Sequence, residues 1–272
     1  MTVAVPVLMY HHVCPSPGLV TVSPDIFEQH MAYLARHGYR ALAADEFLEF
    51  LQGRRALTGR NVLITFDDGY LDNYVYAYPI LKRYGLRATV FAITGQVGDG
   101  AARAHADAGT ALPVTPDHRG CKVAVAEGRA DDVMLRWSEI EAMEASRTVE
   151  VHSHTHTHQR WDRLYADEKE RLAAVHADLA ASRATLQAHL GKASRHLCWP
   201  WGYFGPGYRE TAQRLGFVAQ YATAKAINTP GIDLHQIGRV VAKARAGTWL
   251  GMRLAIYRRP WLGRLYLRLR GA

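Results

Sequence analysis

Cysteine is scarce in this chain, and its three copies, Cys14, Cys121 and Cys198, are far apart and form no paired motif. An odd number of widely spaced cysteines is unlike the dense pairing of disulfide-stapled secreted domains. We therefore expect no disulfide framework, a reducing compartment, and cysteines that serve mainly as small buried side chains.

Long apolar runs are also missing. No stretch approaches the roughly 18 to 20 uninterrupted apolar residues that a helical membrane span needs. The first eight residues have no basic flank and no cleavage site of the kind that marks a secretory signal. These absences predict a cytoplasmic protein.

Acidic residues are absent from residues 243–272, which hold eight basic side chains. The whole formal charge of +8 therefore belongs to this tail, because residues 1–242 balance 25 basic against 25 acidic side chains. A nucleic-acid-binding protein would need a basic excess over a binding face, and the body of the chain offers none. We expect no nucleic acid partner.

Short apolar runs alternate with segments of helical period, and this alternation predicts parallel strands joined by crossover helices. The chain length suits one α/β domain of the barrel type. A stretch rich in Gly, Ala, Asp and Pro breaks the rhythm and predicts an insertion over about residues 96–136, either a lid or a plain surface loop. The runs predicted as buried strands are residues 5–10, 62–66, 88–93, 149–152, 197–199 and 217–221.

Two adjacent carboxylates, Asp67 and Asp68, follow the apolar run 62–66 directly. If that run is a parallel strand, both side chains lie at its carboxyl end, where α/β folds place their chemistry. Two like charges side by side are unfavourable unless a cation binds one of them, so Asp68 would bind a metal and Asp67 would accept a proton from water. The alternative is an ordinary strand-ending turn with Asp72 as a helix cap.

Histidines occupy every second position from His152 to His158. His154 and His158 are four residues apart, and a strand that ends near His154 and then turns can bring both rings to one ion, with Asp68 as the third ligand. A structural histidine is the expected role for His152 and His156. Nonspecific metal scavenging by the tract is the other alternative, but the carboxylate pair favours a genuine metal site.

In two motifs the chain resembles the polysaccharide deacetylase family, which has the NodB-homology domain and forms carbohydrate esterase family four. Residues 65–69 read Thr-Phe-Asp-Asp-Gly, and residues 154–158 read His-Thr-His-Thr-His. The resemblance implies a distorted (β/α) barrel of about seven strands over residues 1–242. It also implies that Asp67 is the catalytic base and that the ligands of a divalent metal, usually zinc but with cobalt, nickel or manganese as alternatives, are Asp68, His154 and His158.

The third motif departs from the common family pattern. Residues 199–203 read Trp-Pro-Trp-Gly-Tyr, similar to the Tyr-Pro-Tyr-Gly form of the branch that acts on poly-N-acetylglucosamine. The arginine that orients the base in many members is missing here, and Arg239 is one candidate to replace it. Trp201 stands where the family's tyrosine offers a backbone N–H to the oxyanion. Trp199 and Trp201 either stack on a sugar ring or fill the top of the barrel.

The family's general acid belongs to a Leu-x-His motif, which is harder to place. His235 lies in the appropriate region, but its surroundings look more like a loop before a final strand that contains arginine. The opening run 5–13 resembles the first strand and Tyr-His pair of the same branch. Either His11 or His12 therefore contacts the substrate or helps to protonate the leaving amine; a structural role is the alternative for both.

The basic tail, residues 243–272, carries Trp, Leu and Tyr at helical spacing among its arginines. A short helix with an apolar side and a basic side suits the surface of an anionic membrane. The alternative is a terminal helix that packs its apolar side onto the barrel. Membrane contact is favoured because the net charge is concentrated here, and it would place the protein on the inner face of the cytoplasmic membrane.

The resemblance predicts a metal-dependent N-deacetylase that hydrolyses the acetamide of an amino sugar. Without an export signal, the expected substrate is a glycan or a lipid-linked glycan, such as an envelope polysaccharide or lipopolysaccharide precursor. A deformylase or amidase acting on a lipid-linked sugar or a small amide is one alternative. A non-catalytic carbohydrate-binding homologue is the other, because the third motif is altered and the acid is not placed.

Overall fold

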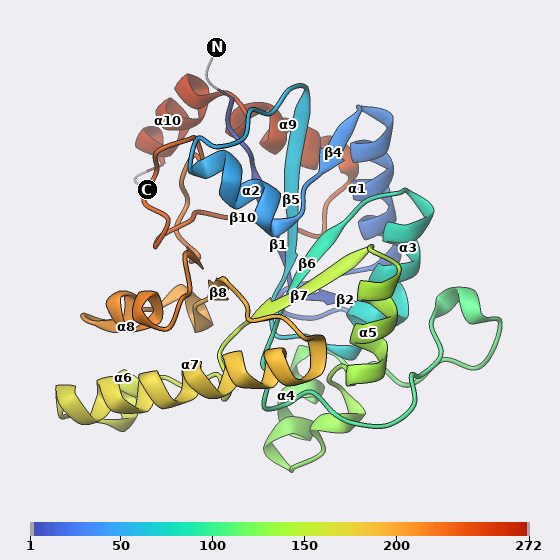
Figure 1. Ribbon diagram of the computed structural model, residues 1–272. Helices are drawn as coiled ribbons and strands as arrows, with labels where there is room; N and C mark the ends of the chain where they lie inside the picture. Colours follow the sequence, from blue (N-terminus) through green and yellow to red (C-terminus); the bar gives the residue numbers. More distant parts are fainter. Residues whose placement is uncertain (1–2, 271–272) are drawn as a thin grey trace.

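Seven parallel strands follow one another in a curled sheet, to which β4 adds an eighth, in the computed structural model, which describes residues 3–270 (Figure 1). Their order is β10-β1-β5-β6-β7-β8-β9, and β4 pairs with β5 outside this path. The expected distorted barrel of about seven strands is confirmed. The strands are β1 (Val7–Tyr10), β4 (Tyr39–Ala41), β5 (Arg60–Phe66), β6 (Ala88–Ala92), β7 (Val149–Ser153), β8 (His196–Cys198), β9 (Ala219–Tyr221) and β10 (Val240–Val241), with a separate pair β2 (His12–Val13) and β3 (Thr21–Val22).

Helices cover the outside of the sheet, as the alternating pattern predicts. Ser23 caps α1 by accepting a hydrogen bond from the Ile26 N–H, and α7 ends at Gly191, whose φ of 66° suits glycine. The helices are α1 (Pro24–Arg36), α2 (Ala44–Leu51), η1 (Asn73–Ala77), α3 (Tyr78–Arg83), η2 (Ala106–Ala108), α4 (His118–Ala126), η3 (Ala130–Asp132), α5 (Trp137–Ala145), α6 (Trp161–Leu164), α7 (Glu168–Leu190), η4 (Pro200–Gly202), α8 (Tyr208–Arg214), α9 (Gly247–Tyr257) and α10 (Pro260–Leu269).

The two edges of the sheet approach each other through one segment near the end of the chain. Val240 of β10 pairs with Leu8 of β1, and Ile237 forms a parallel bridge with Tyr221 of β9. Residues 237–241 therefore touch both edges. Apolar side chains fill the space that the sheet encloses, among them Phe91 and Tyr221, and α2 contributes Phe47 to the same cluster.

The register places the predicted site residues at one end of the sheet. Phe66 of β5 lies opposite Tyr10 of β1 and Val90 of β6, and Ser153 of β7 lies opposite Ala92 of β6. Because neighbouring parallel strands end together there, residues that follow β5 and β7 emerge at the same carboxyl edge. The sequence thus brings Asp67 and His154 together, although they are far apart in the chain.

The region predicted as an insertion, residues 96–136, lies at that carboxyl end. It consists of irregular chain around η2, followed by α4 and η3. Figure 1 shows α4 at one end of the molecule and α10 at the other, beside the start of the chain. The insertion and α10, the last helix of the basic tail, therefore occupy opposite ends of the sheet.

The tail forms two helices with different surroundings. α9 packs closely against α1, and glycines permit this approach: a Cβ on Gly251 would come within 2.3 Å of the Tyr33 ring. α10 instead leaves apolar side chains in solvent, including Trp261 at 68% and Leu269 at 79% exposure. Within residues 3–270, no helix combines the length and apolar character required to cross a membrane.

The buried side chain of His196, the first residue of β8, makes the stability of the folded protein sensitive to pH. The His196 ring is fully buried, with Nδ1 3.2 Å from the Tyr221 hydroxyl and Nε2 3.0 Å from an Asp45 carboxylate oxygen. Burial lowers the pKa of His196 to about 4, against about 6.5 in an unfolded chain. The unfolded state therefore binds more protons than the native state between these values, so stability is complete above pH 6.5 and falls as the pH drops towards 4.

We expect the melting temperature to be lower by about 5 °C at pH 5 than at pH 7.5. His196→Gln should flatten this dependence, and loss of the exposed His37 in His37→Gln should not. Thermal unfolding of the three proteins across this range measures the effect. Equal pH dependence in wild type and His196→Gln would show that another group is responsible.

Candidate metal and catalytic site

A strained turn after β5 presents the two adjacent carboxylates. Asp68 has a φ of 73° and Gly69 a φ of 81°, both in the left-handed region. Gly69 also lies against β6, where a Cβ would approach Ala92 Cα to 3.3 Å. Glycine is therefore required at this position for its conformation and for the close packing. The strain at Asp68 is of the kind that concentrates at functional sites.

Three predicted ligands converge on one point. The Asp68 Oδ1 atom lies 3.3 Å from His154 Nε2 and 3.5 Å from His158 Nε2. All three side chains are nearly or fully buried, and their ligand atoms lie within 4.8 Å of one another. One carboxylate and two imidazoles suit zinc and related divalent ions, and a fourth position would remain for water or substrate.

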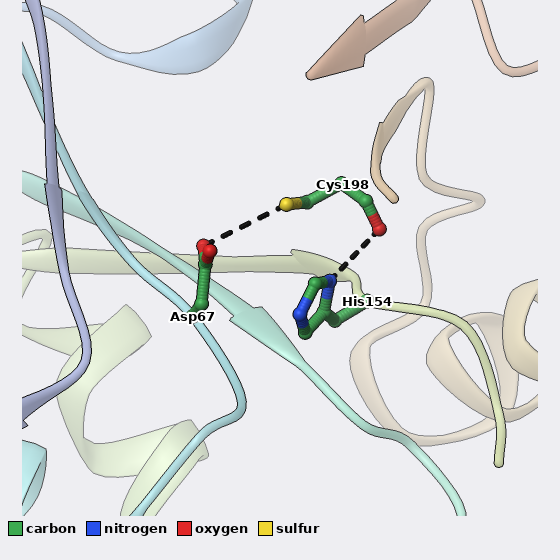
Figure 2. Close-up of side chains that lie close together, drawn as sticks. All are labelled: Asp67, His154 and Cys198. Carbon is green, nitrogen blue, oxygen red and sulfur yellow. Dashed lines mark hydrogen bonds between the residues drawn. The ribbon is translucent and has the colours of Figure 1, made fainter. Parts of the chain in front are cut away.

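The orientation of His154 supports this ligand set. Its Nδ1 donates a hydrogen bond of 2.8 Å to the Cys198 carbonyl oxygen (Figure 2). Because a carbonyl can only accept, one ring proton is on Nδ1, so Nε2, which faces Asp68, is the atom that would bind a metal. This is the usual arrangement of a metal-bound histidine.

A second possible triad consists of Asp67, His154 and Cys198. The Cys198 Sγ lies 3.7 Å from Asp67 Oδ1 (Figure 2). Burial raises the pKa of the Cys198 thiol, which disfavours the thiolate that a metal would need. Asp67 is moreover already paired with a cation, so the Asp68, His154 and His158 set fits a metal better. The described cysteines are free and buried, as expected.

The loop after β7 is held by another buried carboxylate. Asp178 of α7 accepts hydrogen bonds from the backbone N–H groups of His156 and Thr157, at 2.7 and 3.0 Å. Thr155 Oγ1 accepts the His158 N–H at 3.0 Å, closing the turn that returns His158 to His154. His156 points elsewhere, with Nδ1 3.0 Å from the Thr94 hydroxyl. The histidine pattern thus separates into two candidate ligands, His154 and His158, and a residue, His156, that is turned away from them.

Arg239 contacts the predicted base directly. Its Nη1 and Nη2 donate to Asp67 Oδ1 and Oδ2 at 2.6 and 2.8 Å, a bidentate pair buried on both sides. Burial raises the pKa of Asp67, but the Arg239 guanidinium and then His154 and His11 outweigh it, so the pKa is lowered overall. Asp67 is therefore ionised and held in one orientation at neutral pH.

A pocket of about 200 Å³ opens onto these groups. His11 lines it, with Nε2 3.8 Å from Asp67 Oδ2, and burial lowers the His11 pKa more than the two aspartates raise it. Trp201 also lines the pocket, with half of its surface exposed, a φ of 54°, and its ring 4.3 Å from that of His158. The pocket is lined by His11, Leu19, Val20, Asp67, Asp68, His118, Lys122, His154, His158, Trp201, Gly202 and Thr223.

Four candidates from the sequence do not line this pocket: Arg239, which contacts Asp67 from within the core, and three residues that contact neither the pocket nor Asp67. His12 is fully buried, with Nδ1 2.6 Å from Asp72 Oδ2, so it cannot touch a substrate directly. Trp199 is also fully buried and its indole N–H donates to Gln220, which corrects the idea that it stacks on a sugar. His235 lies in the turn before β10, 3.6 Å from an Asp233 oxygen, and is not among the pocket residues.

Two pocket residues come from α4 and were not predicted. His118 Nδ1 lies 3.1 Å from His12 Nε2, so the Asp72 and His12 pair holds its ring in place. Lys122 lies one helical turn further along and adds a positive charge to the pocket. Their spacing of four residues on a capped helix was visible in the sequence, but nothing local indicated which face met the site.

Comparison with known proteins agrees with this geometry. The family model for polysaccharide deacetylase matches residues 54–220. A putative polysaccharide deacetylase of Bacillus subtilis, YxkH, is 44% identical over 93 residues, which cover 34% of this chain and only 33% of that protein. The poly-beta-1,6-N-acetyl-D-glucosamine N-deacetylase of Staphylococcus aureus strain MRSA252 is 25% identical over 228 residues, covering 81% of this chain and 67% of that protein.

Solved structures show the same architecture. IcaB from Ammonifex degensii superposes with a TM-score of 0.70 at 28% identity, over 94% of this chain and 98% of that one. The Streptococcus pyogenes deacetylase PplD superposes with a TM-score of 0.73 at 22% identity, over 93% and 99% of the two chains, which speaks for the fold alone. The family match spans more than half of the sequence and includes the Asp67-Asp68 turn and the histidine loop, so this chain belongs to the polysaccharide deacetylase family.

Proposed function

We propose that this protein is a metal-dependent N-deacetylase that hydrolyses the acetamide of an N-acetylated amino sugar in a glycan. The bidentate contact between Arg239 and Asp67 carries the proposal, because it would orient Asp67 as the base in place of the arginine that the third motif lacks. The relatives named for deacetylation of poly-N-acetylglucosamine favour an amino-sugar polymer over a small amide. A non-catalytic binding protein would have no need for a buried, ionised carboxylate beside the candidate metal ligands.

The proposed reaction uses the side chains around the pocket. Asp67 accepts a proton from the attacking water, whose oxygen forms a bond with the acetyl carbon. The backbone N–H of Trp201 would face the oxyanion, and His11, whose Nε2 lies 3.8 Å from Asp67 Oδ2, is placed to relay the proton that Asp67 accepted to the departing nitrogen. The carbon-nitrogen bond then breaks, giving acetate and a free amine. A divalent cation on Asp68, His154 and His158 would polarise the amide carbonyl and acidify the water.

Release of acetate tests the proposal. Purified protein with added zinc should release acetate from an oligomer of β-1,6-linked N-acetylglucosamine, measured by an enzyme-coupled acetate assay. Mass spectrometry should show a matching loss of one acetyl group per event. Formate release from an N-formylated sugar would instead identify a deformylase, and no product from either, while a control deacetylase works, would contradict the proposal.

Metal binding is expected to depend on the three ligands and not on the whole histidine tract. We predict one zinc ion per chain in wild type and a loss of affinity of at least about tenfold in His158→Ala. His156→Ala is the matched control, because His156 lies in the same tract but contacts Thr94. Elemental analysis after dialysis gives the metal content. Chelation should abolish acetate release and zinc, cobalt, nickel or manganese should restore it; equal metal loss in both variants would reject the site.

We further propose that the tail makes peripheral contact with an anionic membrane. The support is the surface of α10, where Leu265 and Leu269 are exposed beside Arg264 and Arg268. A location on the inner face of the cytoplasmic membrane and a lipid-linked glycan substrate would follow. The catalytic site and α10 lie at opposite ends of β5, roughly 20 Å apart. The glycan of a lipid-linked substrate would therefore have to be long enough to extend from the membrane surface past the barrel to the site.

Vesicle binding tests the membrane contact. Wild type should sediment with vesicles that contain phosphatidylglycerol, and Leu265→Glu with Leu269→Glu should largely prevent this. Leu112→Glu, an exposed leucine in the insertion at the other end, is the control. Sedimentation of all three proteins to the same extent would contradict membrane contact through α10.

A further inference from the structure

A second cleft lies at the amino-terminal end of the sheet, remote from the metal and catalytic site. It has a volume of about 500 Å³ and is formed between the start of β5 and the junction of α9 and α10. Its charged side chains are all arginines: Arg60, Arg258, Arg259 and Arg264. We call this the arginine cleft.

The arginine cleft lacks countercharges. Among residues 3–270, no carboxylate oxygen lies within 4.0 Å of a nitrogen of these four side chains, whereas other surface arginines, such as Arg55, Arg83 and Arg129, are paired with acids. Arg60 instead donates to the His37 carbonyl oxygen. Like charges gathered around one cavity repel each other and create a positive potential. Binding of an anion would relieve that repulsion.

The uncharged lining fits a ligand that is more than a simple ion. Trp261 is 68% exposed and presents an aromatic surface at the cleft. Asn61 is only 3% exposed, and within the described chain its Oδ1 atom has no hydrogen-bond partner. A hydroxyl group on the ligand would supply the missing donor, because an amide oxygen can only accept.

We propose that the arginine cleft binds a phosphate group, as a monoester or a diphosphate. Guanidinium groups match phosphate oxygens with paired hydrogen bonds. A single carboxylate would offset one of the four positive charges, but a phosphate monoester or diphosphate carries about two or more negative charges near pH 7. The size of the cleft also leaves room for the group esterified to the phosphate.

The arginine cleft lies too far from the catalytic site to take part in the reaction. Arg60 begins β5 and Asp67 follows its end, so roughly 20 Å lie between them. A phosphate bound there cannot contact the scissile amide. The cleft would hold the enzyme on a phosphate-bearing molecule, either a lipid headgroup or a soluble phosphate compound, while the pocket at the other end remains free.

Calorimetric titration with inorganic pyrophosphate tests the site without requiring deacetylation. We expect saturable binding at one site per chain in wild type, weakened at least about tenfold in the double variant Arg258→Gln with Arg264→Gln. Arg268→Gln is the matched control, because Arg268 is exposed on the same helix but does not line the cleft. Melting temperatures verify that the variants fold. No binding by wild type, or equal weakening in the control, would overturn the proposal.

Vesicles distinguish the two sources of phosphate. Lipid recognition predicts that wild type sediments with vesicles containing phosphatidic acid better than with phosphatidylglycerol vesicles of equal charge, and that the double variant loses this preference. Pyrophosphate binding without a vesicle preference would support the cleft and identify a soluble phosphate compound as its ligand. Because neither measurement uses acetate release, failure here is separable from failure of the proposed deacetylase.

Discussion

Asp67→Asn is expected to lower kcat by about a thousandfold or more while leaving the zinc content near one ion per chain. Loss of a general base removes roughly 10² to 10⁴ of the rate, and asparagine keeps the size of the side chain but cannot accept the proton. Asp67 is not a member of the ligand set that fits the metal. Acetate release at saturating substrate and elemental analysis of the same sample measure the two effects.

Asp68→Asn is the informative comparison, because it alters the neighbouring carboxylate by the same chemical change. This variant should lose both metal and activity, since Asp68 Oδ1 faces both ligand histidines. The contrast distinguishes a base from a ligand. If Asp67→Asn retains its rate, Asp67 is not the base; if it loses zinc as well, Asp67 is part of the metal site.

Arg239→Gln is expected to destabilise the protein by about 3 to 5 kcal/mol, because it leaves the Asp67 carboxylate buried without its cation. For a chain of this size the melting temperature should drop by about 10 °C. The double variant Arg239→Gln with Asp67→Asn should recover much of this loss, since no unpaired charge then remains buried. Thermal unfolding of the two single variants and the double variant measures the coupling.

The pH profile distinguishes positioning from simple support of the fold. Arg239 lowers the pKa of Asp67, so Arg239→Lys, which keeps the charge but loses the bidentate geometry, should move the acidic limb of kcat/KM to higher pH. A purely structural role would reduce the amount of folded enzyme and leave the limb in place. An unshifted limb in a folded Arg239→Lys protein would contradict the positioning role.

The strands and the metal ligands were predictable because their signals are local. Apolar runs marked β1, β5, β6 and β7, and the spacing of His154 and His158 reflects one turn of chain after β7. β10 has only two residues, too few for a periodic pattern, and β4 reads Tyr-Arg-Ala, in which the arginine interrupts the apolar run. These short strands depend on pairing with β1 and β5, which no local window contains.

Contacts between distant segments limited the prediction of the rest of the site. His235 and Arg239 lie four residues apart, yet only Arg239 reaches Asp67. The Asp233 side chain accepts the His235 N–H and keeps that residue in a turn, and the bridge at Ile237 then directs the chain back along the sheet. Trp199 and Trp201 diverge similarly, because Gln220 of β9 binds the buried indole of Trp199. Contacts with residues distant in the sequence decide which of these side chains reaches the site, and a local sequence pattern does not identify those contacts.

The position of the final strand beside the first has a consequence for biosynthesis. Arg239 follows Asp67 by 172 residues, and β1 gains β10 as a neighbour only when residues 240 and 241 are available. On the ribosome, a nascent chain would contain every proposed metal ligand long before Arg239 could orient the base. Long-range pairing of this kind slows folding. A nascent chain should therefore be able to bind the metal before it can hydrolyse the substrate. Any nascent chain that ends before Arg239 should bind metal but should not turn over substrate.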